Sequence, residues 1–167
     1  MKNEESYPSD LLKDYKILLE YFPSHKEIRP FIIDVIKDWA KTNKKEGKFK
    51  IIEVGSGFGE STGIILENIN CNMVLVEKDV QASNFLKDNL SKFSKSIEIV
   101  NDDIFNLIKD IKDDSYDVFT ASWTIHNFTE EERSDLLPEI FRILKPDGLL
   151  VVFDKVISSK KDEEELA

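Results

Sequence analysis

The sequence lacks several features that mark common protein classes. Its 167 residues contain one cysteine, Cys71, so no internal disulfide can form, and its two histidines, His25 and His126, are too far apart for metal-ligand spacing. No apolar run approaches the roughly 18 residues that span a bilayer, and the N-terminus lacks the basic-then-apolar order of a signal peptide. We therefore expect a cytoplasmic chain without a metal site or a membrane segment.

Basic residues are also in the minority. Lys and Arg total 23 against 33 Asp and Glu, which gives a formal net charge of −10. The lysines are scattered apart from a cluster at 41–50, which we interpret as a solvated loop before a strand. Because a negative net charge repels a phosphate backbone unless basic side chains gather on one face, we do not expect nucleic acid as a partner.

The spacing of apolar residues changes near residue 48. Before it, apolar residues recur at helical spacing over 11–22 and over 28–39. The second stripe follows an S-x-x-E capping box, SHKE, and contains Pro30, which should either kink the helix or mark its first turn. After residue 48 we expect strands near 49–54, 73–77, 96–100, 116–121 and 149–155, and helices near 60–69, 80–92, 104–110 and 130–144.

This order of elements predicts the fold class. Strands that alternate with helices form a mostly parallel sheet with right-handed crossovers, so we expect a three-layer α/β fold. A chain of this length with 41% hydrophobic residues suits one compact domain. Within a single domain, 1–167, we expect N-terminal helices at 1–47, an α/β core at 48–157 and an acidic tail at 158–167.

A glycine-rich turn follows the first predicted strand, in IIEVGSGFGESTGIILENI at 51–69. Its glycines are Gly55, Gly57 and Gly59, but a dinucleotide fingerprint needs a glycine at position 60, where the chain has Glu60. A glutamate at this helix N-terminus would repel a pyrophosphate, and no Lys-Ser or Lys-Thr pair follows to make a P-loop. A positively charged ligand without phosphates fits the acidic surroundings better.

The segment EVGSGFG at 53–59 resembles the first motif of the class I S-adenosylmethionine-dependent methyltransferases, E/D-x-G-x-G-x-G. The resemblance implies a Rossmann-like sheet and S-adenosylmethionine as cofactor. It also implies that Glu53 reaches the methionine ammonium of the cofactor, often through water. Gly55, Ser56 and Gly57 would let the backbone approach the cofactor closely.

Two later segments continue the resemblance. In VLVEKD the family places an acid at Glu77 that takes the ribose hydroxyls, and Lys78 would lie beside the adenine. In IVNDDIF the resemblance puts Asp103 at the adenine amino group and the backbone of Ile104 near the ring. Asp102 occupies the family's usual glycine position, so the two aspartates could exchange roles. Asp79 is better explained as the N-cap of the next helix.

The segment after the fourth predicted strand, TASWTIHNFTEEERSDLLPEIFRILKPDGLLVVFDK, resembles the small-molecule branch of the family and the carboxy-S-adenosylmethionine synthases. Family members that act on nucleobase amines carry a proline pair here. SWTI has Ser122 and Trp123 but neither proline, which disfavours that class, and Ser122 joins the cofactor-binding candidates. His126 is a candidate general base, with packing under the cofactor or capping of the following helix as the alternatives.

These observations favour methyl transfer from S-adenosylmethionine to a small molecule. The resemblance covers roughly 48–155, and the family continues with a helix and an antiparallel strand pair where this chain stops. The fifth strand would then be an exposed sheet edge, which a homodimer or another partner could cover. One alternative is therefore a cofactor-binding module or truncated subunit that is inactive without a partner. A lesser alternative is an enzyme like the carboxy-S-adenosylmethionine synthases.

Overall fold

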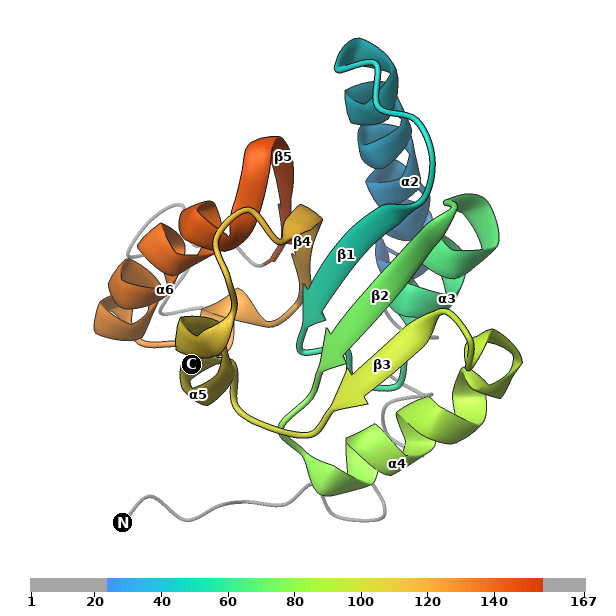
Figure 1. Ribbon diagram of the computed structural model, residues 1–167. Helices are drawn as coiled ribbons and strands as arrows, with labels where there is room; N and C mark the ends of the chain where they lie inside the picture. The colour runs from blue at the N-terminus through green and yellow to red at the C-terminus, as the bar shows by residue number, and fades with distance from the viewer. Residues whose placement is uncertain (1–23, 155–167) are drawn as a thin grey trace, which may run out of the picture.

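The computed structural model describes residues 24–154, with side chains from residue 30 onward (Figure 1). The first predicted helix, at 11–22, and the acidic tail, at 158–167, lie outside the described residues. The strands are β1 (Phe49–Val54), β2 (Cys71–Val76), β3 (Ile97–Val100), β4 (Tyr116–Ser122) and β5 (Leu144–Phe153). The α-helices are α2 (Ser24–Thr42), α3 (Glu60–Asn68), α4 (Val80–Asn89), α5 (Ile104–Leu107) and α6 (Glu130–Ile143), and the 3₁₀ turns are η1 (Ser91–Phe93), η2 (Ile108–Asp110) and η3 (Ile125–Asn127).

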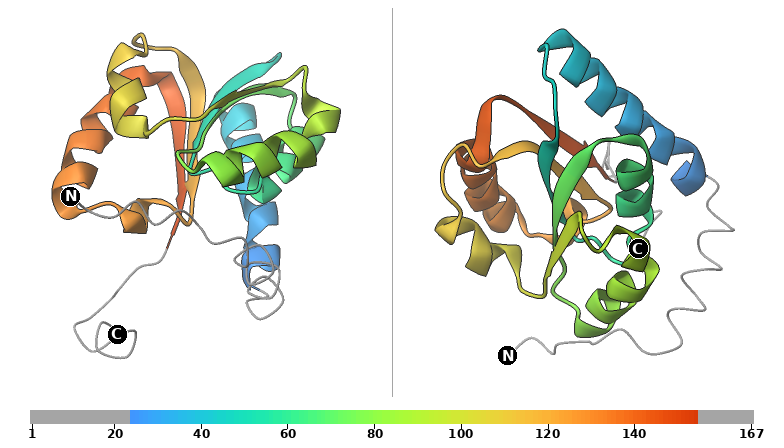
Figure 2. Two further views of the ribbon diagram at one scale, coloured as in Figure 1. Left: turned by 90° about the horizontal axis from the view of Figure 1, so that it is seen from below. Right: turned by 45° about the vertical axis from the view of Figure 1, so that its right-hand side comes forward.

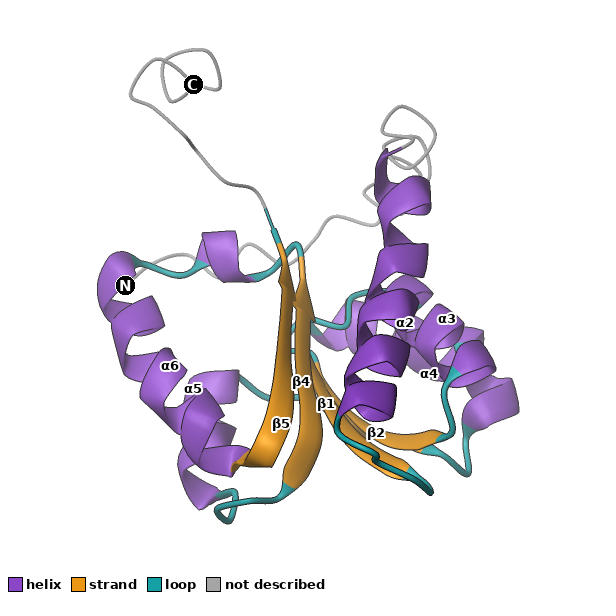
Figure 3. Ribbon diagram, turned by 90° about the horizontal axis from the view of Figure 1, so that it is seen from above, coloured by secondary structure: helices purple, strands orange, loops and turns teal. Residues whose placement is uncertain are grey.

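The five strands form one sheet in the order β3-β2-β1-β4-β5, and every pair in it is parallel. Helices α5 and α6 cover one face, and α2, α3 and α4 cover the other (Figures 2 and 3). The predicted three-layer α/β fold is thus confirmed. Strand order reverses between β1 and β4, and ligands of open α/β sheets bind at the carboxyl ends of the strands at such a point.

Alternation along the strands divides the core between the two faces. In β1, Ile51 packs into the cluster under α2 and α3, whereas the neighbouring Ile52 packs into the cluster under α5 and α6. Both side chains are fully buried, which stabilises the fold by about 1.5–3 kcal/mol each. The central strands therefore need apolar residues on both faces, which explains their near-continuous apolar runs.

Helix α2 packs on the sheet through Ile32, Ile33 and Ile36, which belong to the same cluster as Ile51. Pro30 lies within α2, which begins at Ser24 and runs to Thr42, so this proline does not mark the first turn. None of the helices within the described residues is both long and apolar enough to cross a bilayer.

The fifth strand begins earlier than the predicted start at 149. Leu144 already pairs with Tyr116, and the register then shifts so that Leu149 pairs with Val118. The predicted Pro-Asp-Gly turn is therefore an irregularity inside β5, where Asp147 adopts a φ of 61°. Its carbonyl accepts a hydrogen bond from Trp39 Nε1 of α2, at 2.7 Å, which ties this bulge to the N-terminal helix.

Candidate active site

Two glycines of the turn after β1 have different surroundings. Gly55 has a φ of 69°, and a Cβ added there would lie 2.9 Å from the Cβ of Thr124 and nearer still to its hydroxyl and methyl groups. Gly57 has a φ of 52°, and an added Cβ would meet nothing within 4 Å. Gly55 therefore lets the loop after β4 pack on the turn, whereas Gly57 borders open space that a ligand can enter.

Glu77, at the end of β2, is a buried carboxylate held by the backbone. Its Oε2 accepts a hydrogen bond from the N–H of Gly57 at 2.8 Å, and its Oε1 accepts one from the N–H of Asp79 at 2.9 Å. A carboxylate has about four acceptor positions, so two remain for a ligand. These bonds fix the position of the carboxylate directly beside the glycine turn.

Glu53 lies in β1 beneath the same turn and is 2% exposed. Its Oε2 accepts a short hydrogen bond from the Thr62 hydroxyl of α3. Burial raises the pKa of Glu53 to about 7, against the opposing effect of the Thr62 hydrogen bond. The structure thus places this acid inside the fold, where a nearby positive charge would strongly favour its ionised form.

Two hydroxyl groups of β4 lack hydrogen-bond partners among the described residues. Thr120 pairs with Glu53 in the sheet register, and Ser122 lies two residues further on the same face, at the carboxyl end of β4. Their Oγ atoms are buried and make no hydrogen bond. Leaving a buried polar group unsatisfied costs about 1–3 kcal/mol. A ligand at the end of β4 that forms a hydrogen bond with the Ser122 hydroxyl would remove this cost.

The acidic segment after β3 lies beside the end of β2. Asp103 caps α5 by accepting a hydrogen bond from Phe105 N at 3.1 Å, and its Oδ2 lies 3.9 Å from Lys78 Nζ. Asn101 Nδ2 donates to the carbonyls of Glu77, at 2.8 Å, and Lys78, at 3.1 Å, which joins the two strand ends. The structure therefore brings Lys78 and Asp103 together, and their predicted positions beside an adenine stay predictions.

The neighbouring Asp102 makes local contacts. Its Oδ1 accepts hydrogen bonds from Asn106 Nδ2, at 2.9 Å, and from the Asp103 N–H, at 2.7 Å, and these bonds lower its pKa. Ile104 is buried at the start of α5. Asp79 caps α4 by accepting a hydrogen bond from Ala82 N at 2.8 Å, so its predicted structural role is confirmed.

The loop after β4 meets the end of β5. Trp123 has a φ of 54°, and its N–H donates to the Phe153 carbonyl at 2.7 Å. His126, in η3, is paired with Asp154, the residue that follows β5. The Nδ1 of His126 lies 2.5 Å from Asp154 Oδ1, and its backbone N–H donates to Asp154 Oδ2 at 2.9 Å.

One alternative for His126 is wrong. Helix α6 is capped by Thr129, whose side chain accepts a hydrogen bond from Glu132 N, while the Glu132 side chain accepts one from the Thr129 N–H. This complete capping box leaves no capping role for His126. The histidine instead belongs to a side-chain pair between the ends of β4 and β5.

Four residues with roles in this site were not found by sequence reasoning: Thr62, Asn101, Thr124 and Asp154. Three of them act through partners more than 20 residues away; Thr124, for example, packs on Gly55, 69 residues away. Thr62 is nearer to its partner, Glu53, at a separation of nine residues. A polar residue directly after an apolar strand, as Asp154 is after β5, was the signal available for the last of them.

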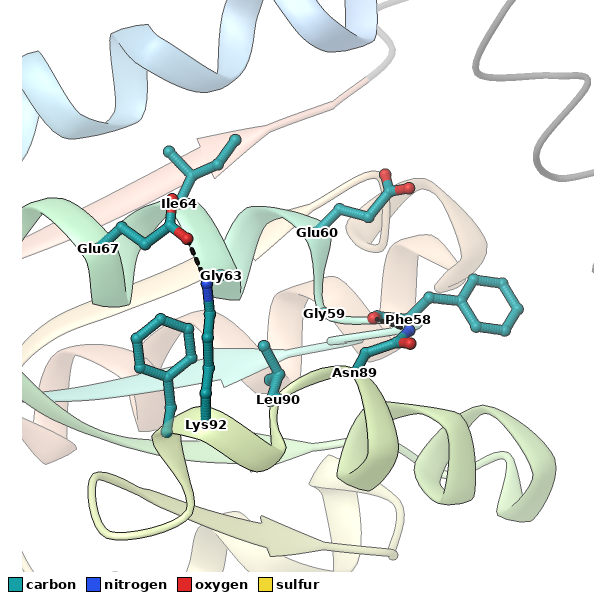
Figure 4. Close-up of a pocket in the computed structure, with 10 residues that line it drawn as sticks. Phe58, Gly59, Glu60, Gly63, Ile64, Glu67, Asn89, Leu90 and Lys92 are labelled. Atoms are coloured by element: carbon teal, nitrogen blue, oxygen red, sulfur yellow. Dashed lines mark hydrogen bonds and ion pairs between the residues drawn. The ribbon is translucent and has the colours of Figure 1, made fainter.

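A groove between α3 and the α4–η1 segment is separate from these residues (Figure 4). The ion pair of Lys92 with Glu67, at 2.6 Å, crosses it, and Asn89 Nδ2 donates to the Phe58 carbonyl at 2.9 Å. None of the predicted site residues lines this groove. The candidate active site is therefore the set of strand ends, from β3 to β5, and not this groove.

Comparison with known proteins gives an independent assignment. A family model described as a methyltransferase domain matches residues 52–152. The carboxy-S-adenosyl-L-methionine synthase of Shewanella halifaxensis is 27% identical over 139 residues, which cover 80% of this chain and 54% of that protein. The ubiquinone/menaquinone biosynthesis C-methyltransferase UbiE of Vibrio campbellii is 27% identical over 116 residues, 63% of this chain and 40% of that protein.

A solved structure shows the same fold. A Methanococcus maripaludis protein, provisionally described as an S-adenosyl-L-methionine-dependent methyltransferase, superposes with a TM-score of 0.72 at 17% identity. The match covers 99% of this chain and 72% of that protein. By contrast, the chain spans about half the length, or less, of the two curated relatives.

The chain belongs to the methyltransferase-domain family, because the family model matches more than half of its length. The resemblance to class I S-adenosylmethionine-dependent methyltransferases is confirmed, and S-adenosylmethionine is the cofactor that this membership implies.

Proposed function

We propose that the chain binds S-adenosylmethionine over the carboxyl ends of β1, β2 and β4 and promotes transfer of its methyl group to a small molecule. The observation that supports this most is the carboxylate of Glu77, which two backbone N–H groups fix beside the open space at Gly57. A carboxylate with two acceptor positions left suits the two hydroxyls of a ribose.

The other residues of the site fit the remaining parts of this cofactor. Glu53, under the turn, supplies negative charge for an ammonium group, and Ser122 has a hydroxyl without a partner among the described residues. Lys78, Asp103 and the Ile104 backbone lie together where the resemblance places the adenine. We include Gly55 and Ser56 as part of the turn, and Asp102 as the residue that orders the segment before α5.

The reaction makes few demands on protein side chains. Bound S-adenosylmethionine supplies a methyl group already activated by a positively charged sulfur. The protein has to hold the acceptor in line with that methyl group and keep water away from it. This division of work explains why the cofactor residues form a recognisable set while the residues around the acceptor do not.

The same geometry disfavours a dinucleotide. Glu60 stands in the first turn of α3, at the helix N-terminus that would have to bind a pyrophosphate. Bulk nucleic acid is disfavoured by the formal charge of −10. We propose a cytoplasmic location, in keeping with the single, buried cysteine.

Two observations favour a second candidate, a cofactor-binding module or subunit that is inactive alone. The chain spans 54% of the length of the Shewanella halifaxensis relative, and β5 is the edge strand of the described sheet, with Val152 45% exposed. A homodimer or a partner chain that pairs with β5 would cover this edge.

The likeness to carboxy-S-adenosylmethionine synthases gives a third candidate. Modification of the cofactor's own methyl group with a second carboxylate needs a cation to hold that carboxylate. Arg142 is committed to Asp113 and Glu139, at 2.7 and 2.6 Å, and Arg133 donates to the Phe128 carbonyl at 2.6 Å. The contacts of these two guanidinium groups are with residues other than those of the glycine turn. We therefore rank this candidate last.

Calorimetric titration tests the cofactor, and a metabolite panel tests the reaction. We expect S-adenosylmethionine and S-adenosylhomocysteine to bind and NADH not to bind; heat with NADH alone would overturn the proposal. Release of S-adenosylhomocysteine with a panel member supports the enzyme. Binding without turnover, followed by turnover when a longer chain or partner is added, supports the module. Mass spectrometry that finds a carboxylated cofactor supports the third candidate.

A further inference from the structure

His126 and Asp154 form a side-chain pair that the cofactor contacts do not explain. Asp154 contacts the histidine twice, at Nδ1 and at the backbone N–H, and its side chain is 9% exposed whereas that of His126 is 26% exposed. The carboxylate is thus more deeply buried than the ring that it contacts, and the ring is partly exposed. This is the arrangement of a histidine oriented by an acid.

The contact with Asp154 favours one of the two ring nitrogens of His126 as the one that carries the proton. An ionised carboxylate can only accept hydrogen bonds, so the Nδ1 of His126 must be the donor. The Nε2 of the neutral ring is then left with its lone pair as an acceptor. Asp154 therefore holds the histidine in the form that can take a proton from another molecule.

The surroundings of the pair restrict its movement. The Trp123 ring lies edge-on to both His126, with centroids 6.3 Å apart, and Phe153, at 5.7 Å. The N–H of Asn127 donates to the Thr124 carbonyl at 3.0 Å, which closes the η3 turn. Backbone hydrogen bonds of Trp123, before η3, and of Asn127, at its end, thus hold the segment that carries the His126 ring.

The pair is also next to the proposed cofactor site. Thr124, two residues before His126, fills the space that a side chain at Gly55 would occupy. The loop that carries His126 is therefore packed on the same glycine turn that borders open space at Gly57. Both His126 and Asp154 follow strands at their carboxyl ends, on the ligand side of the sheet.

We propose that His126 is the general base of the reaction, that Asp154 is its positioning residue, and that the acceptor is a small molecule with a phenol-like or enol-like hydroxyl group. This inference rests on the proposed function. A neutral amine already has a lone pair for attack and needs no base, whereas such a hydroxyl becomes a good nucleophile only as it loses its proton.

The O–H bond of the acceptor breaks and its proton moves to His126 Nε2. The freed electron pair of the oxygen forms the new bond to the methyl carbon, and the electron pair of the breaking carbon–sulfur bond stays on sulfur, which becomes a neutral thioether. Asp154 stabilises the imidazolium until its proton passes to water.

Nitrogen NMR tests the pair without any acceptor. The chain has two histidines, so a His25→Ala variant assigns the spectrum. We expect the neutral His126 ring to carry its proton on Nδ1, and Asp154→Asn to abolish this preference because an amide can donate to Nδ1. A neutral His126 ring that carries its proton on Nε2 in the unmodified chain would overturn the proposal whatever the activity.

Kinetics test the role in catalysis. The probes are phenol, 4-nitrophenol, which is largely ionised at mildly alkaline pH, and aniline, which is a neutral amine at that pH. We expect His126→Ala and Asp154→Asn to lower kcat for phenol about 100-fold or more while S-adenosylmethionine affinity stays unchanged, with a much smaller loss for 4-nitrophenol. Added imidazole should restore turnover in His126→Ala. Asp88→Asn, an exposed change of the same kind on α4, is the matched control.

The outcomes separate the two proposals. If the unmodified chain does not bind S-adenosylmethionine, the proposed function is overturned. Two results would overturn the role of His126 and leave the proposed function standing, provided that the cofactor still binds. One is an equal loss of kcat for phenol and 4-nitrophenol in the variants, and the other is methylation of aniline only. If none of the three probes is methylated while the cofactor is bound, the proposal that the acceptor has a phenol-like or enol-like hydroxyl group is overturned.

Discussion

The carboxyl ends of β1–β3 and those of β4–β5 are built in different ways. In the β1–β3 half, backbone N–H groups position the important carboxylate, since those of Gly57 and Asp79 hold Glu77. In the β4–β5 half, the central contact joins two side chains, His126 and Asp154. A backbone contact survives many substitutions around it, whereas a side-chain pair exists only if both residues are present.

This difference separates what is general in the fold from what is particular to the chain. Under our proposals, the β1–β3 half would hold the cofactor, and the β4–β5 half would contribute the residues that meet the acceptor. Fold alone does not identify that acceptor. Substitutions in each half show how far the two halves depend on one another.

The largest effect is expected at the junction of the halves, with Gly55→Ala. A φ of 69° strains any side chain, and the added Cβ would overlap Thr124. We expect a loss of about 2–4 kcal/mol in the free energy of unfolding, measured by urea denaturation. Gly57→Ala, with open space around it, should cost only about 1–2 kcal/mol of strain.

The double variant Gly55→Ala/Thr124→Ala provides the control. Removal of the Thr124 hydroxyl and methyl groups relieves part of the overlap, so the double variant should lose less stability than the sum of the single changes. Additive losses would show that the two halves do not pack on one another at this point, and would break the comparison.

The next effect concerns Glu53, the buried acid of the β1–β3 half. Its pKa is raised in the folded chain from 4.5 to about 7, so the folded state binds the proton more tightly than the unfolded state. The contribution of Glu53 to stability is therefore fully present below pH 4.5 and is lost as the pH rises from 4.5 to 7. The full shift corresponds to about 3 kcal/mol.

Glu53→Gln should remove this pH dependence, because its amide does not titrate. Urea denaturation of both chains at several pH values between 5 and 8 measures the difference, and the subtraction cancels the other titrating groups. Parallel curves for the two chains would mean that Glu53 is ionised in the folded protein throughout this range, in contact with a charge or with water.

A somewhat smaller effect is expected for Glu77→Ala. Loss of the carboxylate should weaken S-adenosylmethionine binding by about 1.5–3 kcal/mol, the range for hydrogen bonds to a charged group, without unfolding the chain. Calorimetric titration measures it. Glu98→Ala, which removes one exposed acid from β3, is the matched control for net charge. Equal affinities for the two variants would show that Glu77 only stabilises the glycine turn.

The sequence was sufficient for the β1–β3 half because each of its signals is local. The glycine turn, Glu77 and Asp103 follow strands that periodicity could identify, and the structure brings them to adjoining strand ends. Their roles toward a cofactor stay predictions. The predicted start of β5 was wrong because the Pro-Asp-Gly segment is a bulge within the strand. Turn residues indicate the local backbone conformation, but they do not show where strand pairing begins.

The β4–β5 half was beyond sequence reasoning for a different physical reason. His126 was visible as a candidate, but its partner Asp154 lies 28 residues away, and only the parallel pairing of β4 with β5 brings them together. Likewise, the need for a glycine at position 55 becomes clear only when Thr124, from the loop after β4, is seen packed against the glycine turn. A single sequence predicts elements and strand ends, but it does not predict which side chains meet there.

The smallest effect is expected at the end of β4, where two substitutions test whether Ser122 contacts the cofactor or the acceptor. Thr120 and Ser122 both have buried hydroxyls without partners among the described residues, but Thr120 is inside the strand and Ser122 is at its end. Thr120→Val should leave cofactor affinity unchanged and raise stability by up to about 1 kcal/mol, since it removes an unsatisfied group of similar shape. Ser122→Ala should have the same sign of effect on stability but weaken S-adenosylmethionine binding by about 1 kcal/mol, the value of a typical hydrogen bond. Thermal melting and calorimetric titration of the two variants measure both quantities. If Ser122→Ala leaves cofactor affinity unchanged but raises KM for the acceptor, the end of β4 serves the acceptor, and the cofactor is held by the β1–β3 half alone.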